Sequence, residues 1–80
     1  MATYPGARFE PTELALDQMS EQGLEGQYVV DAIQDYGARR EGIKPNQFWY
    51  RGPRNRHPTI EVLIEERGPT LVKIITVHLT

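Results

Sequence analysis

The sequence predicts an α+β domain in which two N-terminal helices pack on one face of a three-stranded antiparallel sheet, in the order α-α-β-β-β. Two observations predict it. Apolar residues recur at helical spacing as far as Tyr36. After Gly37 they recur at every second residue, as in strands, and glycines and prolines occupy turn positions. We assign residues 1–80 to a single domain, with an extended lead-in at 1–9, a helical layer at 10–37 and the antiparallel sheet at 43–79.

The first helix is expected over residues 11–22 and the second over 26–36. Pro11 and the flanking acids Glu10 and Glu13 favour a helix start, and Gly23 can take the left-handed conformation that ends a helix. In the second segment, apolar residues occupy positions i, i+3, i+4 and i+7, namely Val29, Ala32, Ile33 and Tyr36. Gly37 follows them and is expected to end the helix.

Three strands are expected over residues 47–51, 59–65 and 71–79, the last two joined by a hairpin at 66–69. Alternation in the last strand predicts one face made of Leu71, Ile75, Val77 and Leu79, with Lys73 as an exception, and an opposite face made of Val72, Ile74, Thr76 and His78. Two side-chain orientations are possible for the first strand. We favour Phe48 and Tyr50 facing the helices, with Trp49 and Arg51 outward; the reverse places Trp49 inside.

Composition excludes several function classes. The chain has no cysteine, which excludes a disulfide framework, a thiolate metal site and cysteine catalysis. Its two histidines are far apart in sequence, so we predict no metal site, and without a nucleotide-binding motif we predict no cofactor. The sequence shows no secretory pattern and no membrane-spanning stretch, so we expect a cytoplasmic protein that does not bind a membrane.

Charge is distributed in three zones. Residues 1–38 carry a net charge of −6, residues 39–57 carry +5, and residues 58–80 carry −1. A local basic strip can bind phosphate groups even in a chain whose net charge is −2. The residues predicted to contact an RNA substrate are Arg39, Arg40, Lys44, Trp49, Arg51, Arg54 and Arg56.

The uncovered face of the sheet is the expected functional surface. Simple alternation places Trp49, Arg51, Glu61 and His78 on it, with His57 in the loop at its rim. Imidazole and carboxylate groups near phosphate-binding arginines can cleave RNA without a metal, one group removing the 2′-hydroxyl proton and another protonating the leaving oxygen. The acid and base candidates are therefore His57, His78 and Glu61.

Four segments resemble a known family. They are the Leu-Ala-Leu-Asp-Gln-Met-Ser-Glu-Gln-Gly-Leu run at 14–24, then Val30, Ala32 and Ile33, then Phe48-Trp49-Tyr50 with Gly52, and Ile74-Ile75-Thr76-Val77. Together they look like the small toxin-related family catalogued as domain of unknown function 4258, which is similar to the barnase, EndoU, colicin and RelE ribonuclease fold group. The resemblance implies helices that precede an antiparallel sheet, and it adds Tyr50 to the catalytic candidates. The chain departs from the family at three basic positions, where it has Leu14, Gln18 and Gln22.

Two function classes follow from the sequence. The first is a toxin-like, RNA-directed domain that binds RNA and cleaves it as a metal-independent endoribonuclease, or binds it without cleavage. The second is a catalytically silent protein-interaction module, a non-enzymatic relative of the toxin family. Its partner is an antitoxin-like protein bound through the acidic helices or the open sheet face, or a second copy of the chain.

Overall fold

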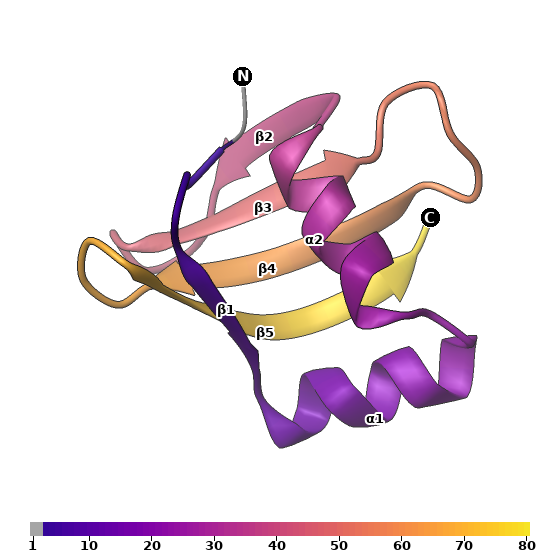
Figure 1. The fold of residues 1–80 in the computed structure, drawn as a ribbon, viewed down its shortest axis with the longest axis horizontal. Helices are drawn as coiled ribbons and strands as arrows, with labels where there is room; N and C mark the ends of the chain where they lie inside the picture. The colour runs from indigo at the N-terminus through magenta and orange to yellow at the C-terminus, as the bar shows by residue number, and fades with distance from the viewer. Residues whose placement is uncertain (1–2) are drawn as a thin grey trace.

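A computed structural model describes residues 3–80 and confirms the α+β class. Seven elements follow one another along the chain, as Figure 1 shows: β1 (Arg8–Pro11), α1 (Glu13–Gln22), α2 (Gly26–Gln34), β2 (Ala38–Glu41), β3 (Gln47–Gly52), β4 (Ile60–Glu66) and β5 (Leu71–Leu79).

The sheet has five strands in the order β1-β5-β4-β3-β2. Strands β2 to β5 form an antiparallel meander, and β1 pairs with β5 in parallel. The expectation of three antiparallel strands is therefore wrong. Both unexpected strands are four-residue edge strands: β2 reads Ala-Arg-Arg-Glu and is exposed throughout, so it shows no alternation, and β1 pairs with residues 71–74 at the far end of the chain. Neither has a local hydrophobic signal.

The helices are shorter than expected. Pro11 belongs to β1, and α1 begins after Thr12, whose hydroxyl oxygen accepts a hydrogen bond from the Ala15 amide at 3.1 Å. The predicted stop at Gly23 is confirmed, with φ of 68°. Helix α2 ends at Gln34 and not at Tyr36, because the Asp35 carbonyl accepts a hydrogen bond from the Arg54 amide and the chain turns toward β2.

One hydrophobic cluster fills the space between the helices and the sheet. Its buried members are Ala15, Met19, Val29, Ala32, Ile33, Tyr50, Ile60, Val62, Ile64, Val72, Ile74 and Val77. Figure 1 shows α2 crossing the sheet while α1 lies beside β5. Tyr50 is therefore on the helical side, which confirms the favoured arrangement of the first predicted strand.

The last strand changes face part-way along its length. Leu63 pairs with Thr76 and Ile64 pairs with Ile74, so Ile75 is an extra residue in β5. Val72 and Ile74 face the core before this bulge, and Val77 faces it afterward. The predicted faces of this strand are therefore wrong before the bulge, because one inserted residue reverses every side chain that precedes it.

Within residues 3–80, no helix is both long and apolar enough to cross a membrane.

Gly52 provides a test of how closely α2 approaches β3. A Cβ atom at this position would lie 2.6 Å from the Ala32 carbonyl oxygen and 3.1 Å from the Asp35 carbonyl oxygen. We expect Gly52→Ala to lower the free energy of unfolding by about 2 kcal/mol or more, because backbone atoms must move apart. Urea denaturation measures this change.

Gly26→Ala is the matched control. A Cβ atom there would meet only the Met19 Cε atom at 3.9 Å, and alanine favours a helix. We expect this variant to be at least as stable as the parent. Equal stability of the parent and Gly52→Ala would contradict the close approach.

Candidate functional site

The side of the sheet opposite the helices carries a row of three chemically different side chains. Arg51 on β3 pairs with Glu61 on β4, and Glu61 pairs with His78 on β5. Tyr50 and Val77 are buried on the helical side, so alternation places all three residues on the other side. Among residues 3–80 no element covers that side (Figure 1). The sequence-predicted grouping on one face is confirmed.

Direct cross-strand neighbours have Cβ atoms roughly 4.5–5.5 Å apart. The row therefore holds a guanidinium, a carboxylate and an imidazole within reach of one small group on a substrate. Arg51 and His78 are exposed, and Glu61 is half-buried.

A second row lies beside the first and supplies an aromatic surface. Arg40, Trp49 and Leu63 are cross-strand neighbours on β2, β3 and β4. The Arg40 Cζ atom lies 5.1 Å from the Trp49 ring centroid. The Arg40 Nη1 atom also donates a hydrogen bond of 2.9 Å to Glu61 Oε2. Arg40 thus links the indole of one row to the carboxylate of the other.

Positive charge without a neutralising partner gathers on one hairpin. Six of the nine Lys and Arg side chains have a carboxylate oxygen within 4.0 Å. Over the described residues 3–80, the other three are Arg39, Lys44 and Arg51. All three lie on β2, on β3 or in the turn between them.

Arg54 and Arg56 do not join the open face. Arg54 contacts Asp35 at 3.2 Å, and Arg56 contacts Asp31 of α2 at 3.1 Å. His57 is exposed in the same loop. The basic strip predicted from the sequence is thus divided between two surfaces, because acidic residues of the helical layer neutralise its second half.

Tyr50 is also separated from the open face. Its ring is 1% exposed, its hydroxyl oxygen lies 2.8 Å from that of Tyr4, and Tyr4 donates to Glu66 at 2.5 Å. Burial raises the pKa of Tyr4, and Glu66 raises it further. Tyr50 accepts a hydrogen bond of 2.9 Å from Arg39 Nε, which raises the pKa of Arg39. The Tyr50 hydroxyl therefore orients an arginine on the helical side.

Arg39 is held by aromatic groups, and within residues 3–80 it forms no ion pair with a carboxylate. Its Cζ atom lies 4.0 Å from the Phe48 ring centroid, and its Nε atom is bound to Tyr50. Sequence reasoning missed this arrangement, because Tyr4 lies in the segment taken as an extended lead-in and no spacing pattern connects it to Tyr50.

Gln18 and Gln22 of α1 bind the edge of β5. Strand β1 ends opposite Ile74, so the rest of that β5 edge has no neighbouring strand. Gln18 Oε1 accepts from the Val77 amide at 2.8 Å, and Gln22 Oε1 accepts from the Leu79 amide at 2.6 Å. Gln22 Nε2 also donates to the Val77 carbonyl at 2.8 Å. Two amide side chains of α1 therefore continue the ladder that β1 begins.

Leu14 is 53% exposed on α1, and its side chain is neither an acid nor a base.

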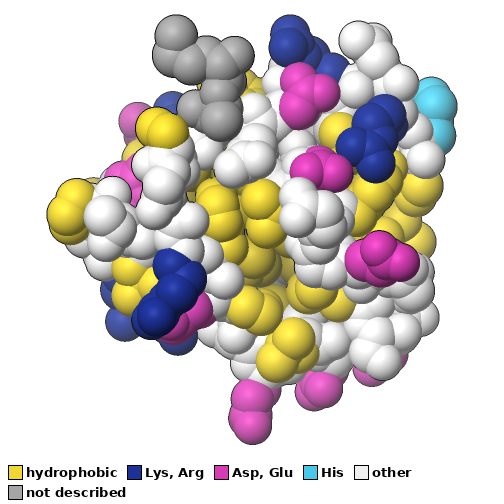
Figure 2. Space-filling view, viewed as in Figure 1, with side chains coloured by type: hydrophobic (Ala, Val, Ile, Leu, Met, Phe, Trp, Pro, Cys, Tyr) yellow, Lys and Arg dark blue, Asp and Glu magenta, His cyan; other side chains and the backbone are white. Residues whose placement is uncertain are grey.

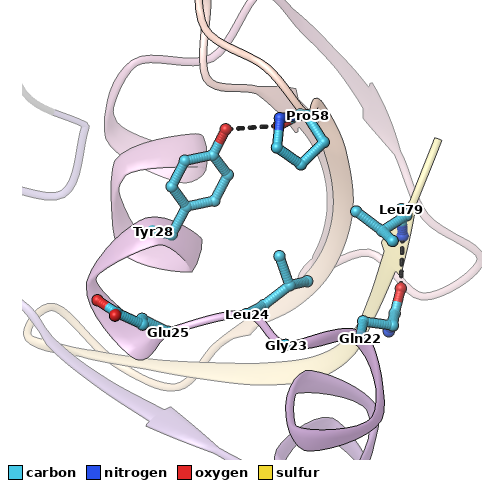
Figure 3. Close-up of a pocket in the computed structure, with 7 residues that line it drawn as sticks. All are labelled: Gln22, Gly23, Leu24, Glu25, Tyr28, Pro58 and Leu79. Carbon is cyan, nitrogen blue, oxygen red and sulfur yellow. Dashed lines mark hydrogen bonds between the residues drawn. The ribbon is translucent and has the colours of Figure 1, made fainter.

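A pocket of about 440 Å³ lies on the helical side. Figure 3 shows it between the end of α1, the start of α2 and the end of β5, and its lining residues are Gln22, Gly23, Leu24, Glu25, Tyr28, Pro58 and Leu79. The Tyr28 hydroxyl donates to the Pro58 carbonyl oxygen at 2.5 Å. None of the site residues predicted from the sequence lines this pocket.

In the described part of the chain, no three His, Asp or Glu side chains converge in an arrangement that could hold a metal ion.

Comparison with known proteins gave no match among family models, curated proteins or solved structures.

Gln22 provides a test of the edge-capping role. Arginine has hydrogen-bond donors only, so Gln22→Arg leaves the Leu79 amide without its acceptor. We expect the free energy of unfolding to fall by about 1–2 kcal/mol. Urea denaturation measures the change, with the exposed Asp17→Arg on the same helix as the control. An equal loss in both variants would contradict the role of Gln22.

Glu65 predicts a pH dependence of stability. Hydrogen bonds from Gln47 and Arg67 lower its pKa below the ordinary value of 4.5. The pKa of Glu65 is lower in the folded state than in the unfolded state. The ionised carboxylate therefore contributes fully to stability above about pH 5, and this contribution is lost as the pH falls through the folded-state pKa. We therefore expect Glu65→Gln to reduce the difference in unfolding free energy between pH 6 and pH 3. An unchanged difference would argue against the contribution of Glu65.

Proposed function

We propose that this chain is a toxin-like, RNA-directed domain that binds RNA on the open sheet face and cleaves it by metal-independent acid–base chemistry. The observation that carries the proposal is the cross-strand row of Arg51, Glu61 and His78 on an uncovered face. Tyr50 and His57 lie outside this row, so the catalytic pair in the proposal is Glu61 and His78.

Each group has a distinct role in the proposed reaction. Glu61 removes the proton from a ribose 2′-hydroxyl, and that oxygen attacks the adjacent phosphorus. The 5′ oxygen leaves with a proton from His78, so the products are a 2′,3′-cyclic phosphate and a 5′-hydroxyl. Arg51 stabilises the charge that develops on the phosphate oxygens, Arg40 positions Glu61 through their ion pair, and Trp49 provides a surface on which a base stacks.

The element order supports the toxin-like part of the proposal. Two helices precede a four-stranded antiparallel meander, in line with the resemblance to the ribonuclease fold group, whereas the parallel strand β1 that precedes the helices is outside that expectation. Two of the three basic positions that the first helix lacks are occupied by Gln18 and Gln22, which bind β5, and the third by the exposed Leu14, so in this chain the proposed chemistry belongs to the strands. The proposed site of action is the cytoplasm.

A protein-interaction module is the second candidate function. It is favoured by the apolar pocket of Figure 3 and by acidic side chains that have no basic partner among the described residues, namely Glu13, Asp17, Glu21 and Glu25. Figure 2 shows acidic side chains along the lower edge, over α1. A basic protein segment with one large apolar side chain fits this surface.

RNA cleavage in the presence of a metal chelator tests the proposed function. We expect the parent protein to produce 2′,3′-cyclic phosphate ends from labelled total RNA. Glu61→Gln and His78→Ala should each lower the rate by about 100-fold or more, because each loses one proton-transfer group. His57→Ala is the control and should cleave at the parent rate, because His57 lies outside the row.

A gel-retardation assay on the same variants separates binding from cleavage. Retardation without cleavage by the parent would restrict the function to RNA binding. Neither cleavage nor retardation would reject the RNA function in favour of the interaction module.

A further inference from the structure

The open sheet face has a small basic pocket at its β2 edge. The volume of this pocket is about 90 Å³, roughly that of three water molecules in the liquid. Pockets for whole ligands begin at roughly 300 Å³, so this one has room for a single chemical group. The residues that line it are Ala38, Arg39, Arg40, Trp49 and Arg51.

The side chains around this pocket favour an anionic group. None of the lining residues is acidic. Arg40 is already engaged, because its Nη1 atom donates to Glu61 Oε2 at 2.9 Å, whereas Arg51 forms no ion pair within residues 3–80. A guanidinium group binds phosphate oxygens through two parallel hydrogen bonds. A phosphate group therefore matches both the size of the pocket and the charge of Arg51.

Ala38 leaves the space beside Arg51 open. The two residues are direct cross-strand partners, and the same row continues through Glu61 to His78. Cross-strand partners have Cβ atoms roughly 4.5–5.5 Å apart, so a longer side chain at residue 38 would fill the pocket. The pocket is therefore one end of the row that carries the proposed reaction.

The order of that row sets the direction of an RNA strand on the sheet. Glu61 lies between Arg51 and His78. In the proposed reaction Glu61 takes the 2′-hydroxyl proton of one nucleotide, and His78 protonates the 5′ oxygen of the next nucleotide. The first nucleotide therefore lies toward Arg51 and β2, and the second lies toward His78 and β5.

We propose that the pocket beside Ala38 binds the phosphate on the 5′ side of the cleaved nucleotide, so that RNA crosses the open face with its 5′ end toward β2. Arg51 then lies between two phosphates, the one in the pocket and the one that is attacked, while the base of the cleaved nucleotide stacks on Trp49. The inference rests on the proposed RNA function, to which it adds a second phosphate contact and the direction of the strand.

Cleavage of three short RNA strands tests the inference. Each strand has a free 2′-hydroxyl at its central nucleotide and 2′-O-methyl groups elsewhere, so only one linkage can be cleaved. The first strand has phosphate at every linkage. In the second, an uncharged methylphosphonate replaces the linkage on the 5′ side of the central nucleotide, and in the third it replaces the linkage that follows the next nucleotide. We expect kcat/KM to fall about tenfold for the second strand, because a charge-assisted contact is lost, and to be unchanged for the third.

Substitution of Ala38 separates the pocket from the rest of the open face. Ala38→Leu fills the pocket, so we expect the ratio of kcat/KM between the first and second strands to fall to about one. Ala38→Ser is the matched control, because it keeps the pocket open, and should show the ratio of the parent. Lys44→Gln removes a cation of the same hairpin that does not line the pocket, and should also keep this ratio. Urea denaturation checks that each variant is folded.

Four outcomes would overturn the inference. Equal kcat/KM for the first two strands would reject the phosphate contact and leave the proposed function standing. A loss confined to the third strand would reverse the direction of the RNA on the sheet. A parental ratio in Ala38→Leu would place the phosphate contact outside the pocket. Failure of the parent to cleave total RNA would reject the proposed function and the inference together.

Discussion

The fold depends on hydrogen-bond partners for the backbone groups on both edges of β5. One edge pairs with β4 from Val72 to Leu79 apart from the bulged Ile75, while the other is divided between β1 and the glutamines of α1. This division positions α1 beside the sheet and, through Thr12, joins the end of β1 to the start of the helix. The bulge at Ile75 lies just after this junction and turns His78 toward the open face. The candidate site therefore exists because of how one strand is covered.

Electrostatic pairing then selects which part of the chain carries free positive charge. The middle of the sequence is strongly basic, but Arg54 and Arg56 are opposed by carboxylates of the second half of the helical layer. Strand β2 is exposed along its whole length, and on the β2–β3 hairpin Arg39, Lys44 and Arg51 have no ion pair among residues 3–80, whereas Arg40 pairs with Glu61. Exposed ion pairs contribute little to stability, and their main effect here is on the distribution of charge over the surface. That distribution separates a basic hairpin from an acidic helical side.

The open face and the helical side also differ in the chemistry they offer. The open face combines charged and aromatic side chains on hydrogen-bonded strands, where Arg51, Glu61 and His78 each have a defined cross-strand neighbour. The helical side has an apolar pocket and a hydroxyl network around Tyr50 that holds Arg39. Groups on rigid strands are held more accurately than groups on loops, which favours Glu61 and His78 over His57 as a proton-transfer pair.

The sequence by itself determined the α+β class, the positions of both helices, the three longest strands and the shared face of Trp49, Arg51 and Glu61. These follow from local periodicity, because a period of 3.6 or 2 is visible within one segment. Tertiary structure decided the two short edge strands, the bulge in β5, the roles of Gln18 and Gln22, and the separation of Arg39 from Arg54 and Arg56. Each of these depends on a partner that lies far away in the chain, and no local pattern records such a partner.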